Sequence, residues 1–142
     1  MAESRASDRE QVVDTMIALT RASNPQGVIV AGDESMEFCL SLRRRGFTRI
    51  STPATCPVSR RQHAVGLITG RNPVTALAQA SAFLSDNSAI AVLIESREGE
   101  FCMAIRHKLQ QMGFRIEAGV RCQRGLVLSA CRLGFAEMEN AA

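Results

Sequence analysis

Short runs of consecutive apolar residues, each long enough for one strand, alternate along this chain with segments of helical periodicity. The clearest runs lie at 27–32, 64–69 and 89–94, and the last of them is the least polar stretch of the sequence. A strand without polar alternation is buried on both faces, which is typical of a parallel sheet covered by helices on each side. We therefore expect a three-layer α/β fold in which 89–94 is the central strand.

The segments between and after these runs complete the predicted fold. Amphipathic helices are expected at 8–22, 35–45, from Pro73 onward and at 98–112, a short strand at 47–52, a loop at 53–62 and a turn at 85–88. For the helix that starts at Pro73, the expected buried face is Val74, Leu77, Ala78, Ser81 and Leu84; for 98–112 it is Phe101, Ile105, Leu109 and Met112. The β-rich segments 114–122 and 126–133, joined by Gln123-Arg124-Gly125, predict a C-terminal hairpin with one antiparallel strand in a mostly parallel sheet.

The length of 142 residues predicts a single domain with an N-terminal helix at about 8–22, a core at about 27–133 and a frayed tail at 134–142. No apolar run approaches the ~20 residues of a membrane span, and the first residues are polar. We expect a cytoplasmic protein that does not contact membranes. Five scattered cysteines without a C-x-x-C pair predict buried thiols and no metal site. The 16 arginines against one lysine are typical of a GC-rich genome, and we expect a bacterial source.

Acidic residues are unevenly distributed. The 48 residues between Glu37 and Asp86 contain no Asp or Glu but seven arginines. The favoured interpretation is a solvated face without a partner, and an anionic partner for the Arg43–Arg71 segment is the alternative. Arg43, Arg44 and Arg45 end a helix, where cations complement the helix dipole. The loop residues Arg60, Arg61 and Arg71 are the candidate anion-binding set. Nucleic acid is the weaker form of this hypothesis, because the chain has no Tyr or Trp on which bases could stack.

Several segments carry a resemblance to a known family. Val28 to Met36 is followed by a helical segment and by Arg43-Arg44-Arg45-Gly46; HAVGLITGRNPVTAL, AFLSDNSAIAVLI and QQMGFRIEAGVRC follow in order. Over about residues 10–133 this pattern resembles the Rossmann-like, class I S-adenosylmethionine-dependent methyltransferases. The resemblance implies a three-layer sandwich with a C-terminal antiparallel hairpin strand. By position in the family pattern, it implies cofactor contacts at Gly32, Asp33, Glu34, Ser35 and Thr69.

The sequence departs from that family at functional positions. The second and third glycines of the cofactor motif are Glu34 and Met36, and the acidic residue of the first strand is Val30. No carboxylate follows the strand at 47–52, and His63 replaces the aspartate that commonly leads the family's fourth strand. About a dozen residues separate 47–52 from Ala64, too few for the family's usual extra strand and two helices. The topology should therefore lack part of its middle, and we expect no cofactor.

Individual candidates also have plainer interpretations. Gly32-Asp33-Glu34-Ser35 could hold a cationic or hydroxyl-rich ligand, but capping of the next helix by Asp33 or Ser35 is favoured. His63 could act as a base at the pocket edge, although a solvated loop residue is favoured. Cys56 could be a reactive thiolate near basic residues, although an inert thiol is favoured. No catalytic residue is assigned, and His107 is given no role.

Two hypotheses from different classes follow. The first is a methyltransferase-like domain that has lost normal cofactor binding and acts as a binding or oligomerisation module, with a homo-oligomer among its forms. The alternative is a minimal S-adenosylmethionine-dependent methyltransferase with an unusual pocket. The sequence leaves open whether the chain is an enzyme.

Overall fold

The computed structural model describes residues 2–56, 63–95 and 99–132. Its helices are α1 (Ala2–Thr20), α2 (Ser35–Arg44), α3 (Pro73–Ser81) and α4 (Gly99–Gln111). Its strands are β1 (Val28–Ala31), β2 (Ile50–Ser51), β3 (His63–Ile68), β4 (Leu84–Ile94), β5 (Arg115–Cys122) and β6 (Gly125–Arg132). No helix in these ranges is both long enough and apolar enough to cross a membrane.

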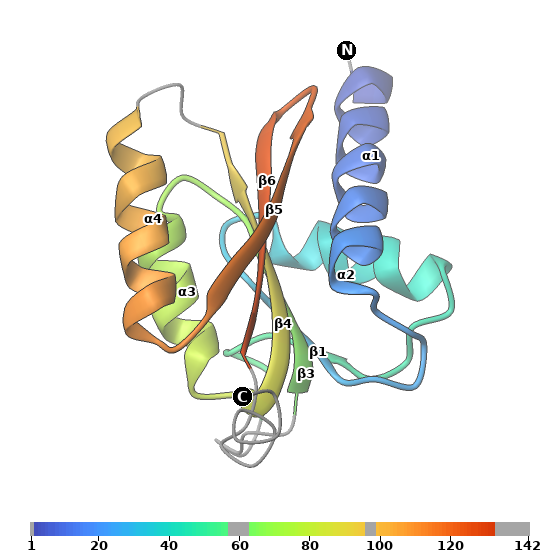
Figure 1. The fold of residues 1–142 in the computed structure, drawn as a ribbon. Coiled ribbons are helices and arrows are strands. Elements are labelled where there is room, and N and C mark those ends of the chain that lie inside the picture. Colours follow the sequence, from blue (N-terminus) through green and yellow to red (C-terminus); the bar gives the residue numbers. More distant parts are fainter. Residues whose placement is uncertain (1, 57–62, 96–98, 133–142) are drawn as a thin grey trace.

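The strands form one sheet in the order β2-β1-β3-β4-β6-β5. β1 is parallel to β2 and β3, β3 is parallel to β4, and β6 is antiparallel to both β4 and β5. Helices α1 and α2 cover one face of the sheet and α3 and α4 cover the other (Figure 1). The three-layer α/β fold with a C-terminal antiparallel hairpin is therefore confirmed.

Two apolar clusters lie on either side of the sheet, and alternate residues of the same strands supply them. In β4, Ile90, Val92 and Ile94 face the cluster under α3 and α4, whereas Ala91 and Leu93 face the cluster under α1 and α2. All five are at most 3% exposed. The prediction that 89–94 is a central, doubly buried strand is confirmed.

Helix α1 begins at Ala2, earlier than the expected start at residue 8, because residues 2–7 contain no helix breaker. Val12, Val13 and Met16 are fully buried against the sheet. The strand expected at 47–52 shrinks to the two residues of β2, which lies at the edge of the sheet.

The expected turn at 85–88 is wrong, because these residues belong to β4. His63 of β3 lies opposite Leu84, and Val65 lies opposite Ala89, so the polar residues between them form a bulge. Ser85 Oγ donates to the carbonyl of Asn87, and Ser88 pairs with Arg132 of β6. Residues 85–88 therefore bend β4 locally without ending it, and pairing with β6 keeps the strand continuous.

The predicted buried face of α3 is only partly right: Leu77 is buried and Val74 packs against the cluster, but the face is centred elsewhere. The structure buries Pro73, Ala76, Leu77 and Ala80, leaves Ala78 exposed, and places Leu84 in β4. Small residues are spread around this helix, so the apolar pattern fits two neighbouring faces and does not discriminate between them. In α4, Ile105 and Leu109 are buried as expected and Met112 is partly buried, whereas the side chain of Phe101 lies outside the described part. The second half of the expected loop, residues 57–62, and the tail at 134–142 also lie outside the described residues.

Candidate functional site

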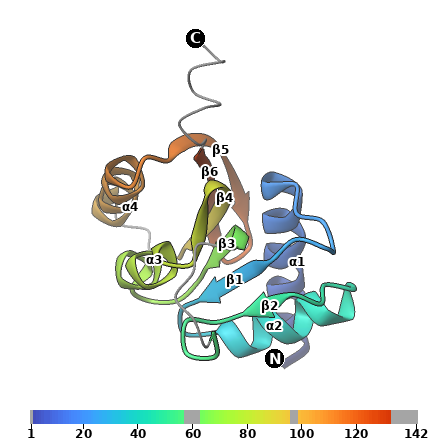
Figure 2. The same cartoon turned by 90° about the horizontal axis from the view of Figure 1, so that it is seen from below.

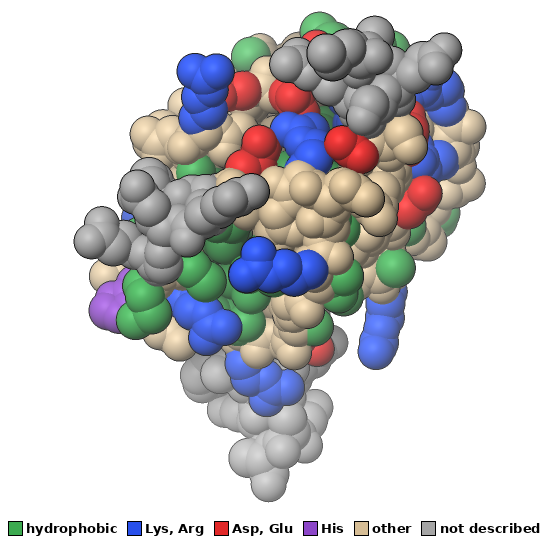
Figure 3. Space-filling view, turned by 90° about the horizontal axis from the view of Figure 1, so that it is seen from above, with side chains coloured by type: hydrophobic (Ala, Val, Ile, Leu, Met, Phe, Trp, Pro, Cys, Tyr) green, Lys and Arg blue, Asp and Glu red, His purple; other side chains and the backbone are tan. Residues whose placement is uncertain are grey.

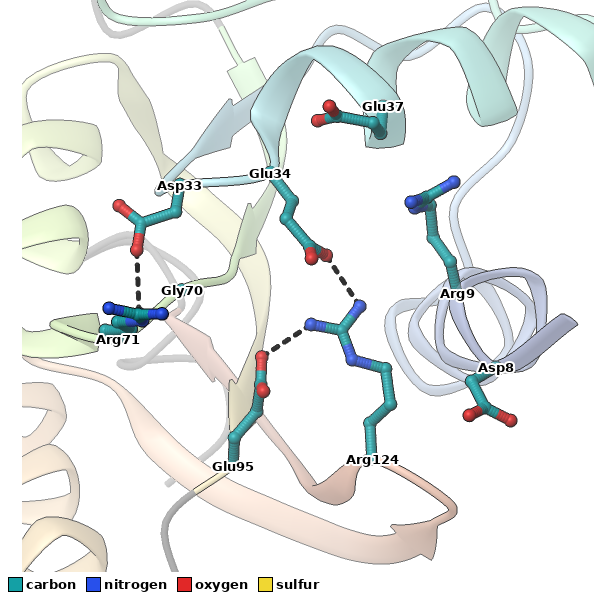
Figure 4. A pocket seen from close by; sticks show the side chains of 9 residues that line it. All are labelled: Asp8, Arg9, Asp33, Glu34, Glu37, Gly70, Arg71, Glu95 and Arg124. Atoms are coloured by element: carbon teal, nitrogen blue, oxygen red, sulfur yellow. Dashed lines mark hydrogen bonds and ion pairs between the residues drawn. The ribbon is translucent and has the colours of Figure 1, made fainter. Parts of the chain in front are cut away.

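A cavity of about 690 Å³ opens at the carboxyl ends of β1, β3 and β4. Four segments meet there: the start of α1, the β1–α2 turn with the first turn of α2, the β3–α3 loop, and the β5–β6 turn beside the end of β4 (Figure 4). Acidic and basic side chains gather side by side over this end of the molecule (Figure 3). The described residues that line it are Asp8, Arg9, Asp33, Glu34, Glu37, Gly70, Arg71, Glu95 and Arg124.

Arg124 crosses the cavity and joins three segments. Its Nη1 donates to Glu34 Oε2 at 2.6 Å, and its Nη2 donates to Glu95 Oε1 at 2.6 Å. Burial of the guanidinium opposes its charge, but hydrogen bonds and attraction from Glu34 and Glu95 outweigh it and raise the pKa of Arg124. The Glu34–Arg124–Glu95 clamp therefore ties the hairpin turn to the β1–α2 turn and to the end of β4.

The β1–α2 and β3–α3 loops pack against each other through backbone. Gly32 has a φ of 118°, and a Cβ there would lie 1.8 Å from the carbonyl oxygen of Thr69. Gly70 has a φ of 105°, and a Cβ there would lie 2.8 Å from the Asp33 nitrogen. Asp33 Oδ2 accepts a hydrogen bond from the Arg71 backbone N–H at 3.2 Å. Both glycines are thus required by loop-to-loop packing, independently of any ligand.

The residues that the family pattern assigned to a cofactor separate into two groups. Asp33 and Glu34 line the cavity together with Arg71. Thr69 is fully buried behind them; its backbone N–H donates to the carbonyl of Ala31, and its Oγ1 has no hydrogen-bond partner in the described part. Ser35 is partly buried at the start of α2.

The helix-capping interpretation of this turn is wrong. The N-cap residue of α2 is Glu34, and its side chain makes no capping hydrogen bond because it binds Arg124. The Asp33 carboxylate accepts from Arg71, on a different loop. The acidic residues after β1 therefore hold neighbouring segments together and do not terminate the helix.

His63 is neither solvated nor at the pocket. It is the first residue of β3, so it lies at the opposite end of that strand from the cavity. Its side chain is buried, Nδ1 lies 3.1 Å from the carbonyl oxygen of Phe83, and its ring meets the Phe83 ring edge-on. The solvated interpretation is wrong because the contact with Phe83 covers the imidazole. The position at the pocket edge is wrong because the cavity lies at the other end of β3. His107 is exposed on α4.

Two of the arginines at the end of α2 bind α1. Arg44 Nη2 lies 2.5 Å from Glu10 Oε1, and Arg45 pairs with both Glu10 and Asp14. Ser41 Oγ donates to Glu10 Oε2 at 2.6 Å. This hydrogen bond, with Arg45 and Arg44 nearby, outweighs partial burial and lowers the pKa of Glu10. These arginines therefore do more than complement the helix dipole, since they fasten α1 to α2.

The remaining candidates are less informative. Cys56 is partly buried and packs against the cluster under α3 and α4. Arg60 and Arg61 lie outside the described residues, so only Arg71 of the anion-binding set is placed, beside Asp33. Within the described part of the chain, no group of three or more His, Cys, Asp or Glu residues could hold a metal ion. The sequence interpretation missed Arg124, Glu95 and Arg9.

No protein-family model matches the sequence, and no curated protein matches it. Solved structures do match, and they show that the chain has the Rossmann-like fold of class I S-adenosylmethionine-dependent methyltransferases, in a reduced six-stranded form. The likeness to solved structures at these identities shows the fold alone.

Three of these structures illustrate the range of proteins with this fold. One is the 1,6-didemethyltoxoflavin-N1-methyltransferase of Burkholderia thailandensis, solved with S-adenosylhomocysteine, at TM-score 0.60 and 15% identity over 93% of this chain and 81% of that one. Another is the precorrin-6y C5,15-methyltransferase of Geobacter metallireducens, at TM-score 0.61 and 10% identity over 87% and 88%. A third is the [4+2]-cyclase SpnF, at TM-score 0.60 and 9% identity over 88% and 81%. Because one neighbour is a cyclase, the fold does not determine the reaction.

Proposed function

We propose that this chain is a methyltransferase-fold domain that has lost normal cofactor binding and acts as a binding or oligomerisation module. The observation that carries the proposal is the Glu34–Arg124–Glu95 clamp. Glu34 stands where the family pattern has a glycine, and its side chain extends into the cavity to meet Arg124 (Figure 4). This supports the proposal, because glycines at that position of the family pattern leave room for a cofactor's amino-acid end, and here a side chain and its ion pair stand instead.

The chemistry of the lining supports the same proposal. Pockets that bind a molecule with an adenine ring are mostly apolar or aromatic, with a few placed polar groups. Among the described lining residues, all except Gly70 carry a charged side chain. Binding of an adenosine group would therefore desolvate charged side chains and bury little apolar surface in return.

Titration calorimetry with S-adenosylmethionine and S-adenosylhomocysteine tests the proposal. We expect no binding tighter than about 1 mM, equivalent to about 4 kcal/mol. The Glu34→Gly variant is the informative companion, because it removes the side chain from the glycine position and frees Arg124 from one partner. A micromolar constant for the unmodified chain would overturn the proposal and favour an enzyme.

The second candidate is a minimal methyltransferase with an unusual pocket. It is favoured by the position of the cavity, because open α/β sheets bind ligands at the carboxyl ends of their strands. In this case the clamp would open to admit S-adenosylmethionine. The calorimetric titration separates the two candidates, since only the second requires micromolar binding by the unmodified chain.

An anionic partner for the Arg43–Arg71 segment is a weaker proposal. Arg44 and Arg45 already have carboxylate partners on α1, and Arg71 lies beside Asp33. We expect weak, salt-sensitive retention on heparin that the Arg60→Ser, Arg61→Ser and Arg71→Ser triple variant leaves unchanged. Tight retention of the wild type that the triple variant loses would favour the anionic partner.

A further inference from the structure

Helix α2 exposes two large apolar side chains on its outer face. Met36 and Leu40 are among the exposed large apolar side chains in the described part of the chain, at 65% and 54% exposure. They lie one helical turn apart. The rest of this face is Glu37, Arg43 and Arg44, all exposed. The inner face, with Phe38 and Leu42, is fully buried against the sheet. Helix α2 is therefore apolar on its inner face and at the centre of its outer face.

Helix α2 lies at the periphery of the described part of the fold. It lies beside β2, the edge strand, and away from the β5–β6 hairpin (Figure 2). Among the described elements, its main contacts are with α1, β1 and β2. Met36 and Leu40 therefore form an exposed apolar patch, which is a feature that commonly marks an interaction surface.

We propose that the outer face of α2 packs antiparallel against the same face of a second copy, around a two-fold axis near Leu40. A two-fold interface must be self-complementary, and this face is. Glu37 lies just before Leu40, and Arg43 and Arg44 lie one turn after it. Antiparallel pairing places Leu40 against the partner's Leu40, Glu37 beside the partner's Arg44, and Met36 along the aliphatic stem of the partner's Arg43.

The charged groups are available for this pairing. Arg44 binds Glu10 through Nη2, but its side chain is 66% exposed, and a guanidinium has five N–H donors. Glu37 has no ion pair in the described part of the chain and is exposed at the rim of the cavity. Because α2 has ten residues, the interface is small, and we expect a dissociation constant in the micromolar range.

This inference rests on the proposed function, in which association is the role of the domain, but the two can fail separately. Self-association is read from molecular mass, whereas the loss of cofactor binding is read from calorimetry. A dimer that binds S-adenosylmethionine would overturn the proposed function alone, and a monomer that does not bind it would overturn the dimer alone.

Light scattering and sedimentation at increasing protein concentration test the dimer. The wild type should shift in the high-micromolar range toward twice its monomer mass of 15.4 kDa. Leu40→Glu should remain a monomer with an unchanged melting temperature, because the side chain is exposed in the monomer. The matched control is Met103→Glu on α4, where the replaced side chain is 59% exposed, and it should dimerise as the wild type does.

A charge exchange distinguishes this geometry from general stickiness. Glu37→Arg and Arg44→Glu should each weaken the homodimer through like charges. An equimolar mixture of the two variants should dimerise again, because one ion pair of the mixed dimer is native and the other is reversed, so both join an arginine to a glutamate. Melting temperatures show that each variant is folded. A monomeric wild type at every concentration, a Leu40→Glu variant that still dimerises, or a mixture without recovery would each overturn the proposal.

Discussion

Arg124 reaches from the turn between β5 and β6 to two carboxylates on separate segments, Glu34 before α2 and Glu95 after β4. Its side chain is 17% exposed, so removal of its charge leaves both carboxylates facing a partly desolvated gap. Because Glu34 and Glu95 are themselves 34% and 42% exposed, water compensates part of this loss. Arg124 therefore joins two segments through ion pairs that are only partly buried.

Arg124→Gln should lower the free energy of unfolding by about 1–2 kcal/mol, less than for a fully buried pair. Urea denaturation measures this directly. The control is Arg121→Gln on the same hairpin, where the side chain is exposed and the change should stay within about 0.5 kcal/mol. Equal effects of the two variants would show that the clamp does not hold the cavity together.

Glu10 makes the α1–α2 contact depend on pH. Its pKa is lowered in the folded state, chiefly by the hydrogen bond from Ser41. A lowered pKa means that the ionised group stabilises the fold fully above the ordinary value of 4.5 and that this stabilisation is lost as pH falls through the folded value. We expect Glu10→Gln to be less stable than the wild type at about pH 7 and the difference to shrink toward about pH 3 in urea denaturation. A difference that does not change with pH would contradict this.

The sequence predicted where the candidate site lies, but it did not predict which side chains contact one another there. Gly32, Asp33 and Glu34 follow an apolar strand, so a pattern along the chain locates them. Arg124 was placed correctly in a hairpin turn, but nothing in its neighbourhood indicates that its side chain reaches Glu34, 90 residues away. The residue that directly follows each strand could have revealed Glu95, because the carboxyl ends of parallel strands meet at one edge of the sheet.

Strand β4 is the element on which both faces of the fold depend. Val92 is fully buried and lies between Ile68 of β3 and Leu128 of β6. Val92→Asp should prevent cooperative folding, since no partner for a carboxylate lies in the apolar cluster around it. The matched change is Val120→Asp on the edge strand β5, where the side chain is 39% exposed. Circular dichroism and solubility should distinguish them; a soluble, cooperatively melting Val92→Asp variant would contradict the central position.

The elements that the sequence predicted well are those buried on both faces, because continuous apolar runs leave no other explanation. Elements whose limits depend on neighbours were predicted less well. The polar residues 85–88 remain in β4 because β6 pairs with Ser88, and β2 is short because, among the described strands, it pairs with β1 alone. The orientation of α3 follows from the sheet, since its own small residues fit more than one face.

The whole molecule shares one set of strands between its two apolar clusters. Ile29 and Val92 face α3 and α4, while their neighbours in sequence, Val30 and Leu93, face α1 and α2. Loss of packing on one face therefore disturbs the strands that support the other. The single domain over 1–142 stays a prediction, and calorimetry tests it.

Leu77→Ala on α3 and Phe38→Ala on α2 each remove a fully buried side chain, one from each cluster. Each should lower the free energy of unfolding by about 2–5 kcal/mol, through lost transfer energy and the cavity left behind. Because the clusters share β1, β3 and β4, each variant should still unfold in one transition, with equal calorimetric and van't Hoff enthalpies. Two resolved transitions in Phe38→Ala would show that α1 and α2 unfold as a separate unit from the rest of the sheet.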